Sequence, residues 1–247
     1  MIAPIEIKTN IDTGVGEALR VLGCPQRPTE RRDIWFAEAR STVEHTPLPL
    51  LSSNLIIKMR SGDQDDITVR LRPCPPDRLV GKWVAPFADD NLMYRLTGDW
   101  CGSHRAMAAS VVSRRNPGSV GTAVADGIDP AHLLDSAQRQ FLVTCTPAGV
   151  PIDHLMRLGP IDSSRWSGIS LDGVGIEVER WAVPEVDLLE ISAMVQPRPG
   201  ESAGELEMRS ATIQLAIRTA LDNRGLIPSP TDVKTRRMLC ALARSRA

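Results

Sequence analysis

Two segments, Ile56-Ile57-Lys58-Met59-Arg60 and Ile67-Thr68-Val69-Arg70-Leu71-Arg72, decide how this chain is interpreted. Both alternate apolar residues with polar or basic ones, and side chains two apart lie on the same face of a strand. The polar residues 61–66 between them are typical of a turn, so we predict one antiparallel hairpin. Because like charges on neighbouring strands repel, its basic face must contact either water, as a solvated surface, or a polyanion. The cations of that face are Lys58, Arg60, Arg70 and Arg72.

The composition excludes several classes of partner. A formal net charge of −1 over 247 residues argues against bulk attraction to nucleic acid or to an anionic membrane, so we expect neither partner. No apolar run has the length of a transmembrane helix. The first residues carry Glu6 and Lys8 where a signal peptide would be apolar, so we expect a cytoplasmic protein. Five cysteines without a C-x-x-C pair favour reduced thiols over disulfides or structural zinc.

Strand patterns outnumber helical ones along the chain. Besides the hairpin, we predict strands at 5–10, 33–36, 92–97, 105–113, 138–145, 174–183 and 187–195. Helices are predicted at 12–22, 150–158, about 202–224 and 230–244. Many strands joined by short turns favour an α+β fold, namely an antiparallel β-barrel, or tunnel, of about eight strands with helices packed outside. We expect a single domain over residues 1–247.

Charged residues alternate on several of these strands, which is unusual for a sheet with a dry face. Glu6 and Lys8 alternate near the start, Glu177 and Glu179 do so later, and Glu190 lies in an otherwise apolar strand. If the sheet closes, such charges face inward, where they are costly without water or ligands. Lysine and arginine bind phosphate oxygens, and carboxylates bind a divalent metal that bridges to them. The alternative for the 177–179 pair is a surface strand with salt bridges.

Taken in the order in which they occur along the chain, the charged strands and the Thr97-Gly98-Asp99-Trp100 segment resemble the motifs of the CYTH superfamily. These proteins are also called triphosphate tunnel metalloenzymes, and the resemblance is greatest to the bacterial stand-alone members. Those proteins begin with an E-x-E-x-K strand, continue with paired basic strands and an E-G-D-W segment, and end with a strand of alternating glutamates. Leu158-Gly159-Pro160-Ile161 and Lys234-Thr235-Arg236 are also similar to segments of the bacterial members. The main matching segments are Glu6-Ile7-Lys8, Lys58-Met59-Arg60, Thr68-Val69-Arg70-Leu71-Arg72, Thr97-Gly98-Asp99-Trp100 and Leu189-Glu190-Ile191-Ser192.

The resemblance implies a phosphohydrolase that cleaves a phosphoanhydride bond of a tri- or diphosphate-bearing small molecule, with Mg²⁺ or Mn²⁺ in a charged barrel interior. Glu190 and Glu177 would be the catalytic residues. The phosphate-binding residues would be Lys8, Lys58, Arg60, Arg70, Arg72 and Arg105. The metal ligands would be Glu6, Glu177, Glu179, Glu190 and Asp99.

Three acidic positions of the family pattern are altered. Pro4, Thr97 and Ser192 stand where the family has glutamates, so the cationic half of the expected site is kept while the metal-binding half is weakened. The alternative is therefore a non-hydrolytic binder of a phosphorylated small molecule, or an enzyme with other chemistry on one. A third hypothesis, a structural protein that only binds a partner, predicts neither turnover nor anion binding.

Overall fold

A computed structural model describes residues 2–40, 48–146, 149–229 and 234–245. No helix in these ranges is both long enough and apolar enough to span a membrane. The strands are β1 Ile5–Ile11, β2 Glu30–Ala39, β3 Leu55–Gly62, β4 Asp65–Leu71, β5 Phe87–Ala88, β6 Leu92–Cys101, β7 His104–Arg115, β8 Leu155–Leu171, β9 Val174–Val183 and β10 Val186–Val195. The α-helices are α1 Val15–Val21, α2 Pro49–Ser52, α3 Ser119–Ala125, α4 Pro130–Leu133, α5 Ser136–Cys145, α6 Ala203–Asp222 and α7 Lys234–Arg244, with 3₁₀ turns at Pro76–Arg78 and Gly81–Val84.

The strands hydrogen-bond in the order β1-β10-β9-β8-β2-β3-β4-β7-β6-β5, and β1 pairs in addition with β6. The strand order therefore returns on itself, which is the pairing pattern of a β-barrel. The predicted α+β barrel class is confirmed, with ten strands in the sheet instead of about eight. The β1–β6 pair is parallel, whereas β1 and β10 run antiparallel.

The chain divides into two compact units, each built from separate segments. The first unit comprises Met1–Arg31, Thr97–Arg105 and Asp162–Arg237, and the second comprises Arg32–Leu96, Ala106–Ile161 and Met238–Ala247. Each unit has its own hydrophobic cluster of buried residues. The expected organisation as a single domain stays a prediction.

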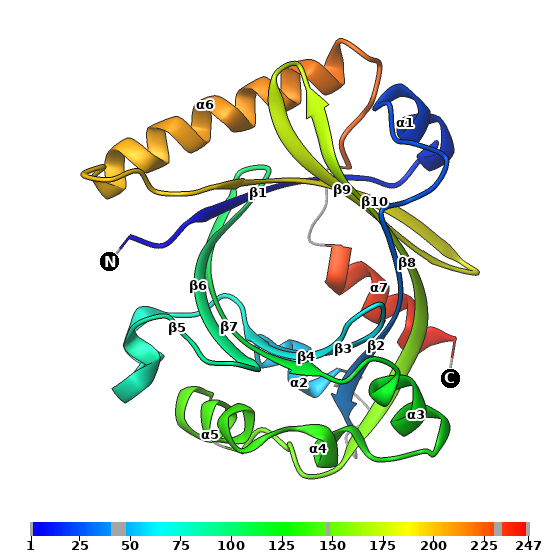
Figure 1. Ribbon diagram of the computed structural model, residues 1–247, viewed down its shortest axis with the longest axis vertical. Helices are drawn as coiled ribbons and strands as arrows, with labels where there is room; N and C mark the ends of the chain where they lie inside the picture. Colours follow the sequence, from blue (N-terminus) through cyan, green and yellow to red (C-terminus); the bar gives the residue numbers. More distant parts are fainter. Residues whose placement is uncertain (1, 41–47, 147–148, 230–233, 246–247) are drawn as a thin grey trace. The chain divides into compact units, whose positions relative to one another are not determined.

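In the first unit, helices cover one face of the sheet. Helix α6 packs against β1 and β9, and α1 packs against β10 (Figure 1). Ile7, Val178 and Ile191 contribute buried side chains from the strands, and Leu206 and Ile217 contribute them from α6. These strand residues alternate with the charged ones, so the charges lie on the opposite face of the sheet.

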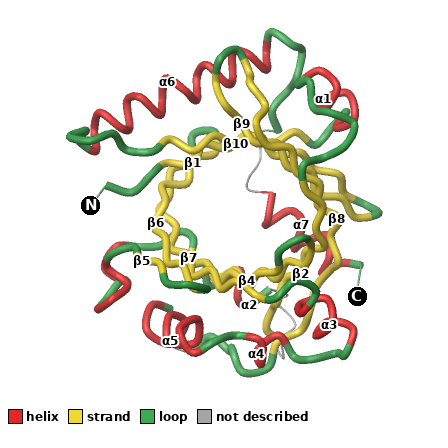
Figure 2. The backbone as a smooth tube through the Cα atoms, in the orientation of Figure 1, coloured by secondary structure: helices red, strands yellow, loops and turns green. Residues whose placement is uncertain are grey.

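In the second unit, the basic hairpin supplies one wall of the core. Ile57 and Val69 lie on its apolar face and are almost fully buried together with Phe141 of α5. Helix α3 contacts both β3 and β4 of the hairpin (Figure 2). The Gln138 amide nitrogen of α5 donates to the Ile67 carbonyl at 2.7 Å, which ties this helix to β4.

Three predictions of secondary structure were wrong. Residues 138–145, predicted as a strand, belong to α5, because Asp135 and Gln138 form a capping box that begins a helix. Residues 150–158 were predicted as a helix, but β8 begins at Leu155, whose amide donates to Asp129 at 3.1 Å. The turn predicted at 61–66 is shorter, because β3 ends at Gly62 and β4 begins at Asp65.

Other elements of the structure also differ from the predicted ones or lie partly outside the described residues. Helix α3 lies in a stretch where neither a strand nor a helix was predicted, and the long strand β8 was not predicted as a strand at all. Helix α6 begins close to the predicted position, with Ser202 and Glu205 in a capping box. The final predicted helix, 230–244, corresponds to α7, and its first four positions lie outside the described residues.

Gly159 of β8 lies where a side chain has no room. Its φ is +124°, and an added Cβ would lie 2.8 Å from the Ile34 carbonyl oxygen and 3.1 Å from Cδ1 of Trp35. Both contacts belong to strand β2 within the second unit. Only glycine therefore fits here without displacing the backbone of the neighbouring strand.

We expect Gly159→Ala to lower the free energy of unfolding by ~2–4 kcal/mol, because it adds a backbone clash and an unfavourable φ. Chemical denaturation measures this. Gly204→Ala is the matched control, since nothing lies within 4 Å of its Cβ position in α6. That control should be neutral or stabilising. Equal stability of the Gly159 variant and the wild-type protein would contradict the packing described.

Candidate functional site

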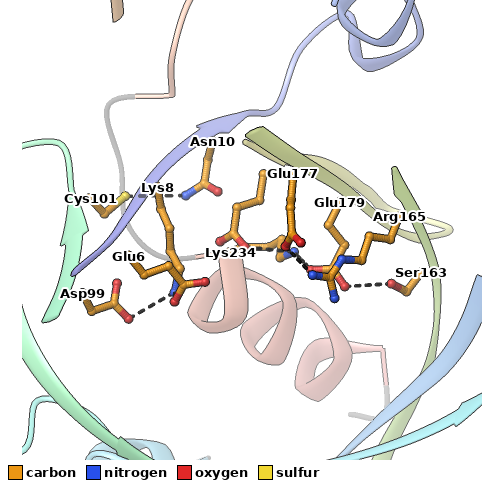
Figure 3. A network of polar contacts seen from close by, with 11 residues as sticks. Glu6, Lys8, Asn10, Asp99, Cys101, Ser163, Arg165, Glu177, Glu179 and Lys234 are labelled. Atoms are coloured by element: carbon orange, nitrogen blue, oxygen red, sulfur yellow. Dashed lines mark hydrogen bonds and ion pairs between the residues drawn. The ribbon is translucent and has the colours of Figure 1, made fainter. Parts of the chain in front are cut away.

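One face of the first unit's sheet carries most of its buried charge. Lys8 of β1 lies opposite Ser192 of β10, which lies opposite Glu177 of β9. One row further along, Glu190 is paired with Glu179, which lies opposite Arg165 of β8. Directly opposed residues of a ladder project to the same face. We call this surface the charged face, and it comprises Glu6, Lys8, Asn10, Ser163, Arg165, Glu177, Glu179, Glu190 and Ser192 together with the neighbouring Asp99. Figure 3 labels all of these residues except Glu190 and Ser192.

Lys8 forms the first cluster of the charged face. Its ammonium lies 2.8 Å from a carboxylate oxygen of Glu6 and 3.2 Å from one of Asp99. The side chains of Lys8 and Asp99 are only 7% and 3% exposed, so bulk water hydrates neither charge. A buried charge persists when a partner offsets its lost hydration, and here one ammonium serves two carboxylates.

A glycine lets these two strands approach each other. An added Cβ on Gly98 of β6 would lie 3.0 Å from Cγ1 of Ile5 on β1. Glu6 is thereby placed directly beside Asp99 in the parallel ladder. Further along β1, the Asn10 side-chain amide lies 3.8 Å from the sulfur of Cys101, the ladder partner of Lys8 (Figure 3).

Lys234, the first residue of α7, forms the second cluster. Its ammonium makes an ion pair with Glu179 and lies 3.3 Å from a carboxylate oxygen of Glu190. It also lies 4.0 Å from the centre of the Trp181 ring, which is a cation–π contact. The Lys234 side chain is 2% exposed, and Ser163 donates a further hydrogen bond to Glu179 at 3.0 Å.

The remaining glutamate of the charged face pairs with an arginine. Arg165 donates a hydrogen bond to Glu177 and forms an ion pair with it (Figure 3). Burial acts to lower the pKa of Arg165, but the combined attraction of Glu177, Glu179 and Glu30 outweighs it and raises that pKa above its ordinary value. Arg165 is therefore a fixed cation. This arrangement is compatible with both alternatives for Glu177 and Glu179, namely residues of a functional site and residues of a strand with salt bridges.

Two further contacts involve residues near Lys234 in the sequence. Arg237 of α7 donates to Asp12 at 2.6 Å, and the Ser229 amide donates to the Asn10 carbonyl at 2.7 Å. Burial acts to raise the pKa of Asp12, but hydrogen bonds from Arg237 and Ser229 outweigh it and lower that pKa. Arg237 thus attaches the first turn of α7 to the segment that follows β1, independently of Lys234 itself.

The hairpin of the second unit has the predicted antiparallel register. Lys58 lies opposite Thr68, Arg60 opposite Asp66, and Arg70 opposite Ile56, so the cations share one face. No two of these cations are directly opposed, and Arg60 lies 2.7 Å from Asp66, which also accepts from Thr68. Repulsion across the ladder is therefore smaller than the sequence suggested. The phosphate-binding roles of Lys58, Arg60, Arg70 and Arg72 stay predictions.

Arg105 is not brought to the Lys8 cluster. Its guanidinium lies 4.0 Å from the Trp100 ring centre and donates to Gln214 of α6 at 2.6 Å. Trp100 follows Asp99 in β6, so it projects to the opposite face, where α6 packs. The predicted phosphate-binding role of Arg105 is untested, and its described contacts are those of a link between strand and helix.

The carboxylates expected to hold Mg²⁺ or Mn²⁺ do not fit a divalent ion as they are arranged. Across the described ranges, no group of three or more histidine, cysteine, aspartate or glutamate side chains is placed to bind a metal. Each expected ligand instead contacts a resident cation. Glu6 and Asp99 contact Lys8, Glu179 and Glu190 contact Lys234, and Glu177 contacts Arg165.

Lys234, Arg165 and Asp66 were missed as site residues in the sequence. Lys234 lies in a segment similar to bacterial CYTH proteins, but nothing in its local pattern separates it from an ordinary helix lysine. Arg165 could not be placed because β8 itself was not predicted. Asp66 was assigned to the turn, although its alternation with Thr68 and Arg70 is the signal of a strand.

Structural comparison shows the fold that this chain shares with known proteins. A candidate adenylate cyclase from Bacillus halodurans superposes with a TM-score of 0.57 at 14% identity, over 96% of this chain and 97% of that one. HpAC1 from Hippeastrum, a candidate adenylyl cyclase described as having a dominant triphosphatase activity, gives 0.57 at 12% identity over 96% of both chains. No protein-family model and no curated protein sequence matches the chain. At these identities the likeness shows a shared fold alone.

We expect Lys8→Met to lower the free energy of unfolding by ~3–5 kcal/mol, because it leaves buried carboxylates without their ammonium. Adding Asp99→Asn should recover ~1–3 kcal/mol, since the double variant removes one of the uncompensated charges. Urea denaturation measures both. Arg20→Met, which removes an exposed ion pair with Glu17, is the control and should change stability little. Additive losses from the two substitutions would contradict the Lys8–Asp99 pairing.

Proposed function

We propose that this chain is a divergent phosphohydrolase that binds a small molecule bearing a tri- or diphosphate chain and cleaves a phosphoanhydride bond. The observation that carries the proposal is the charged face, where buried ammonium groups of Lys8 and Lys234 lie among carboxylates. Such clusters are costly for stability and are enriched at functional sites. The shared fold with a protein described as a triphosphatase agrees with this choice.

The chemistry follows from the groups present. In phosphoryl transfer the charge on the transferred group is spread over its oxygens, and fixed cations stabilise it. Lys8, Lys234 and Arg165 would supply such cations once phosphate oxygens compete with the carboxylates for them. Water would attack the terminal phosphorus as the bridging P–O bond breaks, and Glu177 or Glu190 would take the proton of that water.

The second candidate function is non-hydrolytic binding of the same class of ligand. A specific observation favours it, because every carboxylate expected to bind metal or to orient water contacts a lysine or arginine. A carboxylate whose oxygens contact a lysine or arginine has fewer oxygens available to bind a metal or to orient a water molecule. Binding without turnover is therefore the function that we would assign if no hydrolysis is measured.

The decisive experiment combines calorimetry with phosphate release from tripolyphosphate, nucleoside triphosphates and thiamine triphosphate, with and without Mg²⁺ or Mn²⁺. We expect binding in the micromolar range and release of phosphate above the protein-free rate. Arg60→Ala with Arg70→Ala tests the separate prediction that the hairpin binds phosphate, and it should weaken tripolyphosphate binding at least about tenfold. The matched control is Arg20→Ala with Arg218→Ala, two exposed arginines on helices, which should leave binding unchanged.

Unchanged affinity in the Arg60 and Arg70 double variant would reject the phosphate-binding role of the hairpin. Tight binding without phosphate release would replace the hydrolase by the binder. No heat of binding and no thermal stabilisation by any of these ligands would reject both functions. The single-domain organisation and the cytoplasmic location remain separate predictions.

A further inference from the structure

Glu179 and Glu190 face each other across the β9–β10 ladder, which creates a requirement for a cation. Directly opposed residues of a ladder lie close together, and two carboxylates in such positions repel. Glu190 is 13% exposed and Glu179 25%, so water screens their repulsion only in part. A positive charge between the two side chains removes this cost. In a metalloenzyme a divalent ion commonly provides that charge.

Here the charge comes from the chain itself. The ammonium of Lys234 contacts both carboxylates, and the Trp181 ring covers another side of it. Two carboxylate oxygens and an aromatic face form a set of partners suited to an ammonium, whereas an aromatic ring offers no ligand atom to Mg²⁺ or Mn²⁺. The surroundings of this position therefore match a lysine better than a metal.

The position of Lys234 is also fixed from outside the cluster. Arg237, three residues further along α7, donates a hydrogen bond to Asp12, so the first turn of the helix is held beside β1 by a contact other than that of Lys234. An ammonium held in this way has a high effective concentration at the two carboxylates. A free divalent ion must displace it to bind there.

We propose that Lys234 is a built-in substitute for a divalent cation, which makes the Glu179–Glu190 pair a metal-independent centre. Lys8 serves Glu6 and Asp99 in the same way on the neighbouring strands. This inference concerns the same face as the proposed function. Its test uses metal binding without substrate, so that either proposal can fail while the other stands.

The test is titration of the full chain with Mn²⁺ alone, followed by electron paramagnetic resonance and calorimetry. The wild-type protein and Lys234→Arg should bind no Mn²⁺ at this face. Lys234→Met should gain a Mn²⁺ site at least about tenfold tighter than any site in the wild-type protein. Adding Glu190→Gln to Lys234→Met should remove that site. Lys82→Met, which removes an exposed lysine of the second unit, is the control and should gain nothing.

Two results would overturn the proposal. One is Mn²⁺ binding to the wild-type protein that weakens with Glu179→Gln or Glu190→Gln, because the pair would then hold metal despite Lys234. The other is a folded Lys234→Met variant that gains no Mn²⁺ site. If that variant does not fold, the comparison of the wild-type protein with Glu190→Gln decides alone. Equal Mn²⁺ binding by those two proteins supports the proposal, and weaker binding by Glu190→Gln rejects it.

Discussion

Opposed carboxylates on neighbouring strands require a cation between them, and this requirement shapes the first unit. Glu179 and Glu190 are brought together by the β9–β10 register, which the apolar residues on the other face fix. A shift by one residue would move every charged side chain into the core under α6. The strand register, the packing of α6 and the composition of the charged face therefore depend on one another. The ammonium of Lys234 supplies the required cation, and Lys8 does the same for Glu6 and Asp99.

This arrangement changes what the site can do. In the CYTH resemblance, lysines and arginines bind phosphates while carboxylates hold metal. In the structure the same carboxylates are already engaged with lysine and arginine side chains. An incoming polyphosphate would compete with the carboxylates for the ammonium groups, instead of bridging through a metal. Pro4, Thr97 and Ser192 stand where the CYTH resemblance would lead us to expect glutamates, and carboxylates that are already neutralised by lysine would need fewer acidic neighbours.

Much of the fold could be predicted because period-two alternation is a strong local signal. The hairpin at residues 56–72 and the strands β9 and β10 follow directly from it. Helix α5 was missed because QFLVTC has strand-forming residues, and the capping box at Asp135 overrides them. Strand β8 was missed because glycine, proline and serine interrupt its pattern, and a bulge near Trp166 breaks the alternation.

The candidate site was predictable only in part, for a different reason. Alternation shows which residues share a face of a strand, and it correctly grouped Glu6 with Lys8 and Glu177 with Glu179. It cannot show which distant segment supplies their counterions. Lys234 is 44 positions from Glu190 in the sequence numbering, and the helix that carries it is held by the contact of Arg237 with Asp12. Such long-range pairs are fixed by tertiary packing and leave no local signal.

The most direct measurement of the central claim is NMR of the lysine ammonium groups at neutral pH, with and without millimolar MgCl₂. Buried, hydrogen-bonded ammonium groups exchange slowly with water and become visible. The account predicts protected signals for Lys8 and Lys234 that are assigned by Lys8→Arg and Lys234→Arg and do not change on addition of Mg²⁺. Loss of the Lys234 signal when Mg²⁺ is added would contradict it, because the metal would then displace the lysine from its two glutamates.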